Sequence, residues 1–257
     1  MSKTVVFLSF DDGREDTARI AYPIMRKYGL TATIHITTGF VDGTWKPDNW
    51  KSCDKAMSVN DVINMYNDGF EISLHGDKHQ TDLDDLLVSK NKLATWGIDV
   101  DNIGFSVPNS QISDAQKQDF SEILKKHHIK YMRCGRNSKC YTFVSKVCFI
   151  LYKFLRFQSC YNLFNKYNLN NPRRNYELNT VVVKSTDKAI TIKRFIEKYK
   201  TDSNIILMLH SVLSKSDELY GKDSWCWDVK QFEELCQYLK EASSKGEICV
   251  KNICEEV

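Results

Sequence analysis

The stretch TVVFLSFDDG, residues 4–13, joins an apolar run typical of a buried β-strand to two adjacent carboxylates, Asp11 and Asp12. Neighbouring carboxylates at the end of a buried strand repel each other and lose solvation. A protein tolerates that cost where a cation binds or where one carboxylate takes part in proton transfer. The pair therefore predicts a metal-assisted active site.

Histidines follow two other strand-like runs. His75 and His79 come after the run at 70–74, and His210 closes the run at 205–209. In a barrel of parallel strands, the carboxyl ends of the strands form the reactive face. We therefore expect these three histidines to meet the two aspartates at that face.

Strand-like and helix-like segments alternate along the chain, which favours an α/β fold with parallel strands. Apolar runs predict strands at 4–9, 31–36, 70–74, 103–107, 130–133, 180–184 and 204–209. Helical periodicity and end signals predict helices at 16–28, 58–67, 81–96, 113–127, 190–199 and 229–244, with Ser58 and Ser113 as N-caps.

The length and composition indicate one domain over residues 1–257, large enough to bury about 70–75% of its unfolded surface without disulfides. Nine cysteines are scattered without a CxxC pair, which favours reduced thiols and a reducing compartment. The sequence shows neither a signal segment nor a run of about 18–20 uncharged apolar residues. We therefore predict a cytoplasmic protein.

A basic, aromatic-rich insertion interrupts the alternation at about 134–178. No acidic residue lies between Glu122 and Glu177, whereas 12 lysines and arginines do. Three interpretations are open: a helical lid packed on the barrel, a basic amphipathic element on an anionic membrane, and a basic pocket for a phosphate-bearing substrate. The charge is accompanied by no motif for nucleic-acid binding, so we expect no nucleic-acid partner.

The residues around the two aspartates suffice for hydrolysis. Asp12, His75 and His79 offer one oxygen and two nitrogens to a divalent ion, with a position left open for water. Bound metal lowers the pKa of water from 15.7 to about 7. Asp11 can accept that water's proton, and His210 can protonate the leaving group or stabilise the oxyanion. Such a site cleaves an amide or an ester.

Three ordered motifs resemble those of the polysaccharide deacetylase family, the metal-dependent carbohydrate esterases with a nodulation-deacetylase-like domain. Residues 9–13 match [Thr/Ser]-Phe-Asp-Asp-Gly in full, and residues 207–210 match Leu-x-x-His. Residues 75–79 match His-[Ser/Thr]-x-x-His, with Gly76 in place of the hydroxyl residue. The resemblance implies a distorted (β/α)7-type barrel in a single domain, with the basic helical insertion within it.

The same resemblance implies a role for each motif residue. Asp11 would be the general base and His210 the general acid, and Asp12, His75 and His79 would hold one divalent metal ion. Zinc is the first expectation. Cobalt, manganese, nickel and iron also suit imidazole and carboxylate ligands.

The third motif of the family, Arg-x-Pro, departs from the pattern and reads Ser106-Val107-Pro108. The arginine that orients the catalytic carboxylate is therefore missing, and a serine cannot replace a planar cation with five donors. Arg133 or Arg136, just past a neighbouring strand, is our hypothesis for a guanidinium that reaches the carboxylate from a new direction.

The fourth motif, an aspartate near a tryptophan that supports the acid histidine, is also altered. Asp187 follows the appropriate strand but has no tryptophan beside it, and the run at 225–228 offers an aromatic wall and a carboxylate instead. We expect substrate contacts from Trp45, Trp50, Pro108, Arg133, Trp225 and Trp227.

These observations predict a metal-dependent hydrolase that removes an acetyl group from an N-acetylated sugar. The substrate would be an intracellular saccharide or a nucleotide- or lipid-linked glycan intermediate, and the insertion would contact an anionic membrane or a pyrophosphate-linked carrier at the membrane periphery. Two alternatives are open: an amidase acting on a non-sugar acylated metabolite, and a catalytically impaired glycan-binding protein.

Overall fold

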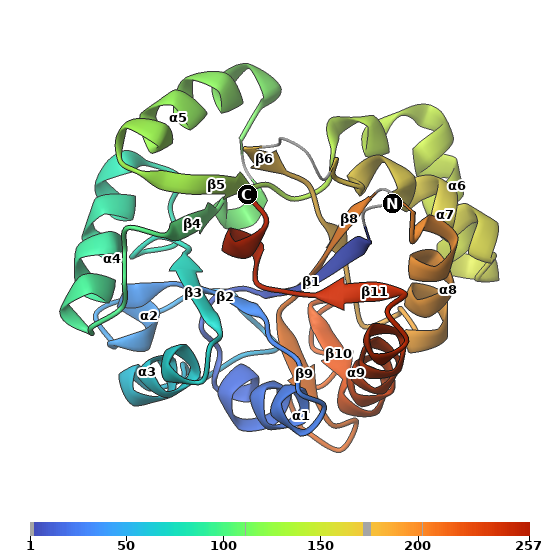
Figure 1. Ribbon diagram of the computed structural model, residues 1–257, viewed down its shortest axis with the longest axis horizontal. Coiled ribbons are helices and arrows are strands. Elements are labelled where there is room, and N and C mark those ends of the chain that lie inside the picture. The colour runs from blue at the N-terminus through green and yellow to red at the C-terminus, as the bar shows by residue number, and fades with distance from the viewer. Residues whose placement is uncertain (1–2, 111, 172–175, 202) are drawn as a thin grey trace.

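The computed structural model describes residues 3–110, 112–171, 176–201 and 203–257 (Figure 1). Its core is a curled sheet of parallel strands in the order β6-β5-β4-β3-β2-β1-β8-β7, with β11 also paired to β1. The strands are β1 (Thr4–Phe10), β2 (Thr33–Ile36), β3 (Glu71–Leu74), β4 (Ile103–Ser106), β5 (Ile129–Arg133), β6 (Glu177–Leu178), β7 (Val181–Val182), β8 (Asn204–Leu209) and β11 (Ile248–Val250). The predicted α/β fold, a distorted (β/α)7-type barrel in a single domain, is confirmed.

Strand β1 lies inside the sheet, and all seven of its residues are buried. It pairs with β8 along one edge, and with β11 and then β2 along the other. A strand that is covered on both faces reads as a continuous apolar run, as residues 4–8 do. The residues that follow β1 and β8 therefore emerge side by side at one end of the barrel.

Helices ring the curled sheet in Figure 1. They are α1 (Tyr22–Lys27), α2 (Thr38–Val41), α3 (Val59–Asn67), α4 (Leu83–Thr95), α5 (Asp114–Lys126), α6 (Phe143–Leu155), α7 (Gln158–Asn165), α8 (Ala189–Tyr199) and α9 (Val229–Ser244). The predicted N-caps Ser58 and Ser113 both accept the amide hydrogen of the third helical residue and complete capping boxes.

Three local features differ from the sequence prediction. The helix expected at 16–28 is split into a π-helical turn, Thr17–Ala21, and α1. Pro23 explains the break, because it has no amide hydrogen for the α-helical ladder. The expected loop at 37–56 contains the short helix α2, and a second small sheet pairs β9 (Ser211–Leu213) with β10 (Cys226–Asp228).

The basic segment at 134–178 contains α6 and α7, which form a helical hairpin beside α8 at the edge of the barrel (Figure 1). Tyr152 and Tyr161 anchor this α6–α7 hairpin in the main core. Arg173 and Arg174, two of the basic residues of the segment, lie outside the described residues. No described helix is both long and apolar enough to cross a bilayer.

Gly104 in β4 provides a test of the packing inside the barrel. A Cβ atom at this position would overlap the ring of Tyr131, which is fully buried and whose hydroxyl donates to Glu71 at 2.7 Å. We expect Gly104→Ala to lower the free energy of unfolding by about 3 kcal/mol, measured by urea denaturation.

The matched control is Gly43→Ala. Gly43 has a φ of +78° but no neighbour within 4 Å of its would-be Cβ, so only backbone strain of about 1 kcal/mol is expected. Equal losses in the free energy of unfolding of the two variants would show that the ring of Tyr131 does not exclude a side chain at residue 104.

Candidate active site

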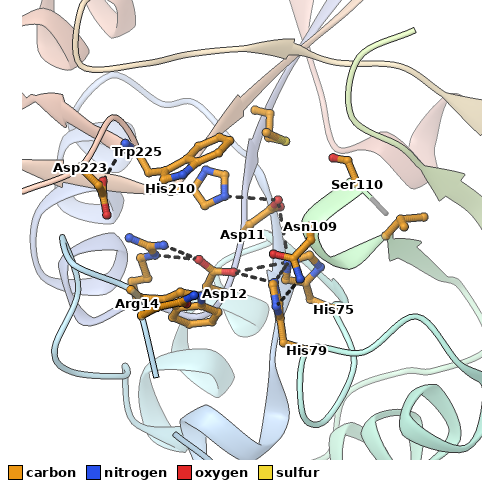
Figure 2. Close-up of a pocket in the computed structure, with 14 residues that line it drawn as sticks. Asp11, Asp12, Arg14, His75, His79, Asn109, Ser110, His210, Asp223 and Trp225 are labelled. Atoms are coloured by element: carbon orange, nitrogen blue, oxygen red, sulfur yellow. Dashed lines mark hydrogen bonds and ion pairs between the residues drawn. The ribbon is translucent and has the colours of Figure 1, made fainter. Parts of the chain in front are cut away.

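A pocket of about 270 Å³ opens at the carboxyl ends of β1, β3 and β8 (Figure 2). Asp11 and Asp12 follow β1, His75 and His79 follow β3, and His210 follows β8. All five line the pocket. The backbone amide of Asp11 donates to the Leu209 carbonyl at 3.1 Å, which extends the β1–β8 ladder to the pocket floor.

Asp12, His75 and His79 converge on one point. Oδ1 of Asp12 lies 3.4 Å from Nε2 of His75 and 3.6 Å from Nε2 of His79, and the two Nε2 atoms are 3.2 Å apart. The three donor atoms all lie within 4.8 Å of one another, which suits a single divalent ion. The donor set itself, one carboxylate and two imidazoles, also fits such an ion.

The surroundings of the two imidazoles favour metal binding. Nδ1 of His75 lies 2.9 Å from the Ser106 carbonyl, so it carries the proton and leaves the lone pair on Nε2. Burial and the neighbouring His75 lower the pKa of His79 to about 4, so its ring is neutral at pH 7. Burial lowers the pKa of His75, but Asp11 and Asp12 outweigh burial and raise it. Because neutral imidazoles are the form that coordinates metal, an ion that binds here would displace any proton on Nε2 of His75.

The loop between His75 and His79 explains the glycine in the second motif. Amide groups of Asp77, Lys78 and Gln80 donate to the carboxylate of Asp85 at 2.9, 2.7 and 3.1 Å. Gly76 has a φ of +80°, and a Cβ atom there would overlap that carboxylate. A serine or threonine cannot occupy this position while Asp85 holds the loop.

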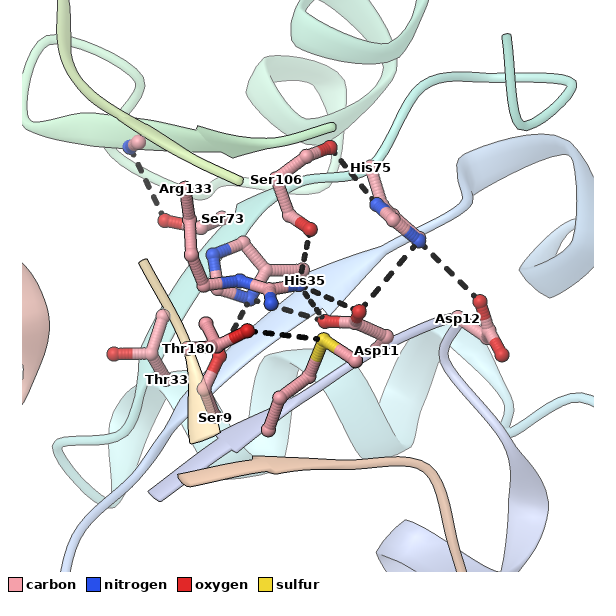
Figure 3. Close-up of polar contacts among 12 residues, drawn as sticks. Ser9, Asp11, Asp12, Thr33, His35, Ser73, His75, Ser106, Arg133 and Thr180 are labelled. Atoms are coloured by element: carbon pink, nitrogen blue, oxygen red, sulfur yellow. Dashed lines mark hydrogen bonds and ion pairs between the residues drawn. The ribbon is translucent and has the colours of Figure 1, made fainter. Parts of the chain in front are cut away.

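Asp11 is held by an arginine from another strand (Figure 3). Nη2 of Arg133 contacts both carboxylate oxygens of Asp11, at 2.5 Å for Oδ2, and also contacts Oγ of Ser106. Burial raises the pKa of Asp11, but Arg133 and the neighbouring histidines outweigh burial and lower it. Asp11 is therefore ionised at neutral pH, as a general base must be.

The register of the sheet explains how Arg133 reaches this position. Ser106 in β4, where the family carries arginine, is the direct partner of Arg133 in β5. The guanidinium is thus supplied from the adjacent strand and passes over the serine side chain. Arg136, the other candidate, packs over the rings of Phe149 and Phe164.

His210 faces Asp11 from the opposite side, with Nε2 3.9 Å from Oδ2, and its ring centroid lies 4.5 Å from that of Trp225 (Figure 2). Its buried Nδ1 atom has no hydrogen-bond partner in the described part of the chain. Asp187 accepts from the Tyr152 hydroxyl, and Asp228 caps α9. Neither aspartate supports His210, so only the aromatic part of the expected fourth motif is present.

The sequence profile of the polysaccharide deacetylase family matches residues 1–135. The chain belongs to this family. None of the curated proteins matches the sequence. Members of the polysaccharide deacetylase family are metal-dependent hydrolases that act on amide bonds of acetylated saccharides, so the chain is an enzyme of the deacetylase class.

Several solved structures share the fold. The Xyl-CE4 domain of a multidomain xylanase from the hindgut metagenome of Trinervitermes trinervoides is 12% identical, with 99% of this chain and 89% of that chain covered and a TM-score of 0.52. A family 4 carbohydrate esterase from Streptomyces lividans in complex with acetate is 12% identical, with coverages of 96% and 91% and a TM-score of 0.51. A CE4 family pseudoenzyme from Bacillus anthracis is 11% identical, with coverages of 99% and 66% and a TM-score of 0.53.

Two of the six residues predicted to contact the substrate line the pocket. Trp50 and Trp225 line the pocket, whereas Trp45 does not line it and stacks on His79, with ring centroids 6.4 Å apart. Trp227 is buried in the core and donates its indole hydrogen to the Asp187 carbonyl, so it is not a wall of the pocket. Pro108 and Arg133 are also buried and absent from the wall, which Val107, Asn109 and Ser110 form instead.

Two buried residues of the deacetylase site are missing from the sequence prediction. Arg14 donates to Oδ2 of Asp12 at 2.8 Å and to Oγ of Ser211 at 2.8 Å. His35, inside β2, lies 3.6 Å from Oδ1 of Asp11 and 3.1 Å from the Tyr131 hydroxyl. Arg14 directly follows the first motif, so its place in the sequence could have identified it as a site residue. Nothing in the sequence around His35 indicates the site, because His35 lies within an ordinary strand pattern.

Replacing Arg133 tests its role as a positioning residue. Arg133→Ala leaves the Asp11 carboxylate buried without its cation, so we expect kcat to fall by about 100-fold. The pKa of Asp11 should rise, which moves the acidic limb of the kcat/KM profile to higher pH. Both are measured by acetate release across pH, with Lys130→Ala, an exposed cation of the same strand, as control.

A swap variant separates this role from a merely structural one. Ser106→Arg combined with Arg133→Ser returns the guanidinium to the third-motif position on β4, directly across the ladder. We expect the swap to recover activity relative to Arg133→Ser alone. An unchanged pH profile in Arg133→Ala, with full turnover, would contradict the assignment.

Proposed function

We propose that this protein is a metal-dependent deacetylase that removes the acetyl group from an N-acetylated sugar. The convergence of Asp12, His75 and His79 beside the ionised Asp11 is the observation that carries the proposal. Zinc is the ion we propose for this donor set, and cobalt, manganese, nickel and iron are compatible with the same ligands.

The residues divide the reaction between them. A metal ion held by Asp12, His75 and His79 would polarise the acetyl carbonyl and lower the pKa of the attacking water to about 7. Asp11 accepts the proton of that water, while Arg133 fixes the orientation of the carboxylate. His210 delivers a proton to the leaving nitrogen. Burial lowers the pKa of His210 to about 4, so it is neutral at rest. The proton that it delivers is the one that Asp11 has taken from the water, because Nε2 of His210 lies 3.9 Å from Oδ2 of Asp11, and the transfer leaves both groups in their starting protonation states.

The finer substrate assignment is drawn from the walls of the pocket and from the insertion. Trp50 and Trp225 offer aromatic surfaces on which a sugar ring can stack. We propose that the substrate is an intracellular saccharide or a nucleotide- or lipid-linked glycan intermediate. The enzyme would act in the cytoplasm, in peripheral contact with an anionic membrane or a pyrophosphate-linked carrier. The basic charge of residues 123–176 supports an anionic partner.

A second candidate is a catalytically impaired glycan-binding protein. The unpartnered Nδ1 atom of His210 favours it, because an acid histidine that lacks a supporting carboxylate is poorly oriented. The contact of Arg133 with Asp11 opposes it, because it restores the cation that the altered third motif lacks. An amidase acting on a non-sugar acylated metabolite is the third possibility.

Acetate release distinguishes these functions. The purified protein is incubated with N-acetylated sugars, sugar nucleotides, lipid-linked sugars and acylated amino acids, and its bound metal is quantified. We expect acetate from a sugar substrate. His79→Ala should lose both the metal and the activity, whereas Asp11→Asn should retain the metal and lose about 10³-fold in kcat.

The control is His127→Ala, a histidine outside the pocket, which should change neither readout. Acetate from acylated amino acids alone would support the amidase. Metal and sugar binding without acetate from any compound would support the impaired binding protein.

A further inference from the structure

A second pocket, also of about 270 Å³, lies between the α6–α7 hairpin and the barrel. We call it the insertion pocket; Arg136, Tyr152, Lys153, Phe164, Lys184 and Asp187 are among its lining residues. It shares a wall with the active site. Nζ of Lys184 lies 4.4 Å from the ring centroid of Trp225, which lines the catalytic pocket, and 3.3 Å from Oγ of Ser224, which lines the insertion pocket.

Lys153 and Lys184 line the insertion pocket together with Arg136, which packs over the rings of Phe149 and Phe164. The one acidic residue of the pocket, Asp187, is engaged by the Tyr152 hydroxyl at 2.9 Å and by the backbone amide of Lys184 at 2.8 Å. Within the described residues, no ion pair joins Lys153 or the ammonium of Lys184 to a carboxylate. Burial and the nearby Arg136 lower the pKa of Lys184. An anion between these cations would relieve their mutual repulsion.

We propose that the insertion pocket binds the phosphate or diphosphate of a phosphorylated sugar whose acetylated ring enters the catalytic pocket beyond Trp225. This assignment rests on the proposed function and names its substrate class. The aromatic rings of Tyr152 and Phe164 would contact the group attached to the phosphate, either a nucleoside or an isoprenoid chain.

Calorimetric titration of the metal-loaded protein tests the pocket, with inorganic pyrophosphate, UDP and farnesyl diphosphate as probes. We expect binding that Lys184→Gln and Arg136→Gln each weaken by about tenfold or more. Lys130→Gln, an exposed cation outside the pocket, should bind normally. His79→Ala should also bind normally, which excludes capture of the probe by the catalytic metal. Tighter binding of UDP or of farnesyl diphosphate distinguishes the nucleotide from the lipid source.

Acetate release is measured separately, so the two proposals fail independently. Deacetylation without diphosphate binding, or binding unchanged in Lys184→Gln, overturns the insertion pocket and leaves the proposed function standing. Diphosphate binding that depends on Lys184, without acetate from any sugar, supports the pocket and overturns the proposed function.

The outer surface of the α6–α7 hairpin is rich in exposed apolar side chains. Nine of the twelve exposed large apolar side chains among the described residues lie on or next to α6 and α7: Phe143, Val144, Val147, Ile150, Leu151, Phe154, Leu155, Phe157 and Leu163. Phe143 is 82% exposed and Phe154 is 74% exposed, whereas Ser145, Cys148 and Tyr152 form the buried side of α6. A patch of this kind marks an interaction surface.

The positive charges around this patch indicate which kind of partner it binds. Lys146 and Arg156 are exposed along α6 and at its end, and the sequence from 123 to 176 contains no acidic residue. A second copy of the chain would place cations against cations across a symmetric interface. An anionic bilayer accepts both the apolar side chains and the flanking cations.

We also propose that the exposed face of α6 docks on an anionic membrane surface, independently of the chemistry in either pocket. Co-sedimentation with phosphatidylcholine vesicles, with and without about 30% phosphatidylglycerol, tests this. We expect binding only to the anionic vesicles, weakened about tenfold or more by Ile150→Ser with Phe154→Ser. Val88→Ser, at a 45% exposed apolar position on α4, should bind as the wild type does.

Three outcomes would overturn the membrane proposal. The first is equal binding to neutral and anionic vesicles, and the second is no binding to either. The third is self-association without lipid, detected by size-exclusion chromatography, that the Ile150→Ser and Phe154→Ser double variant abolishes.

Discussion

The site depends on the separation of two buried carboxylates that are adjacent in the chain. Asp12 has a φ of +81°, so the backbone turns sharply after β1 and the two carboxylates meet different cations. Arg133 neutralises Asp11, whereas Arg14 and the two imidazoles face Asp12. His75 lies between the two carboxylates, with Nε2 4.0 Å from Oδ2 of Asp11 and 3.4 Å from Oδ1 of Asp12. Because each carboxylate also has an arginine of its own, one can act as a base while the other remains available to a metal.

The sequence predicts the barrel well because most of its strands are buried on both faces and are therefore largely apolar. The expected strand at 130–133, Lys-Tyr-Met-Arg, is an exception, and its first residue is exposed. The very short strands β6, β9 and β10 carry too few residues to show such a pattern. The split of the first helix depends on Pro23. Pro23 lies in the interior of the helix expected at 16–28, where a proline breaks or kinks a helix, so the sequence contained a signal for the split that the prediction of one helix did not use.

Local motifs predict those parts of the site whose residues lie close together in the sequence, as in residues 9–13 and 75–79. Sequence alone could not select Arg133 over Arg136, because the choice depends on which residue lies opposite Ser106 in the β4–β5 ladder. His35 was missed for a related reason. Its contact with Asp11 joins β2 to the end of β1, and no spacing within the chain encodes it.

The relocated arginine connects the active site to the insertion. Arg133 ends β5, and the chain passes from it within three residues to Arg136, which lines the insertion pocket. In the described structure, one short segment therefore holds the Asp11 carboxylate and supplies a cation to the neighbouring pocket. The arginine that compensates for the altered third motif and a cation of the insertion pocket therefore lie on consecutive parts of the chain, at the end of β5.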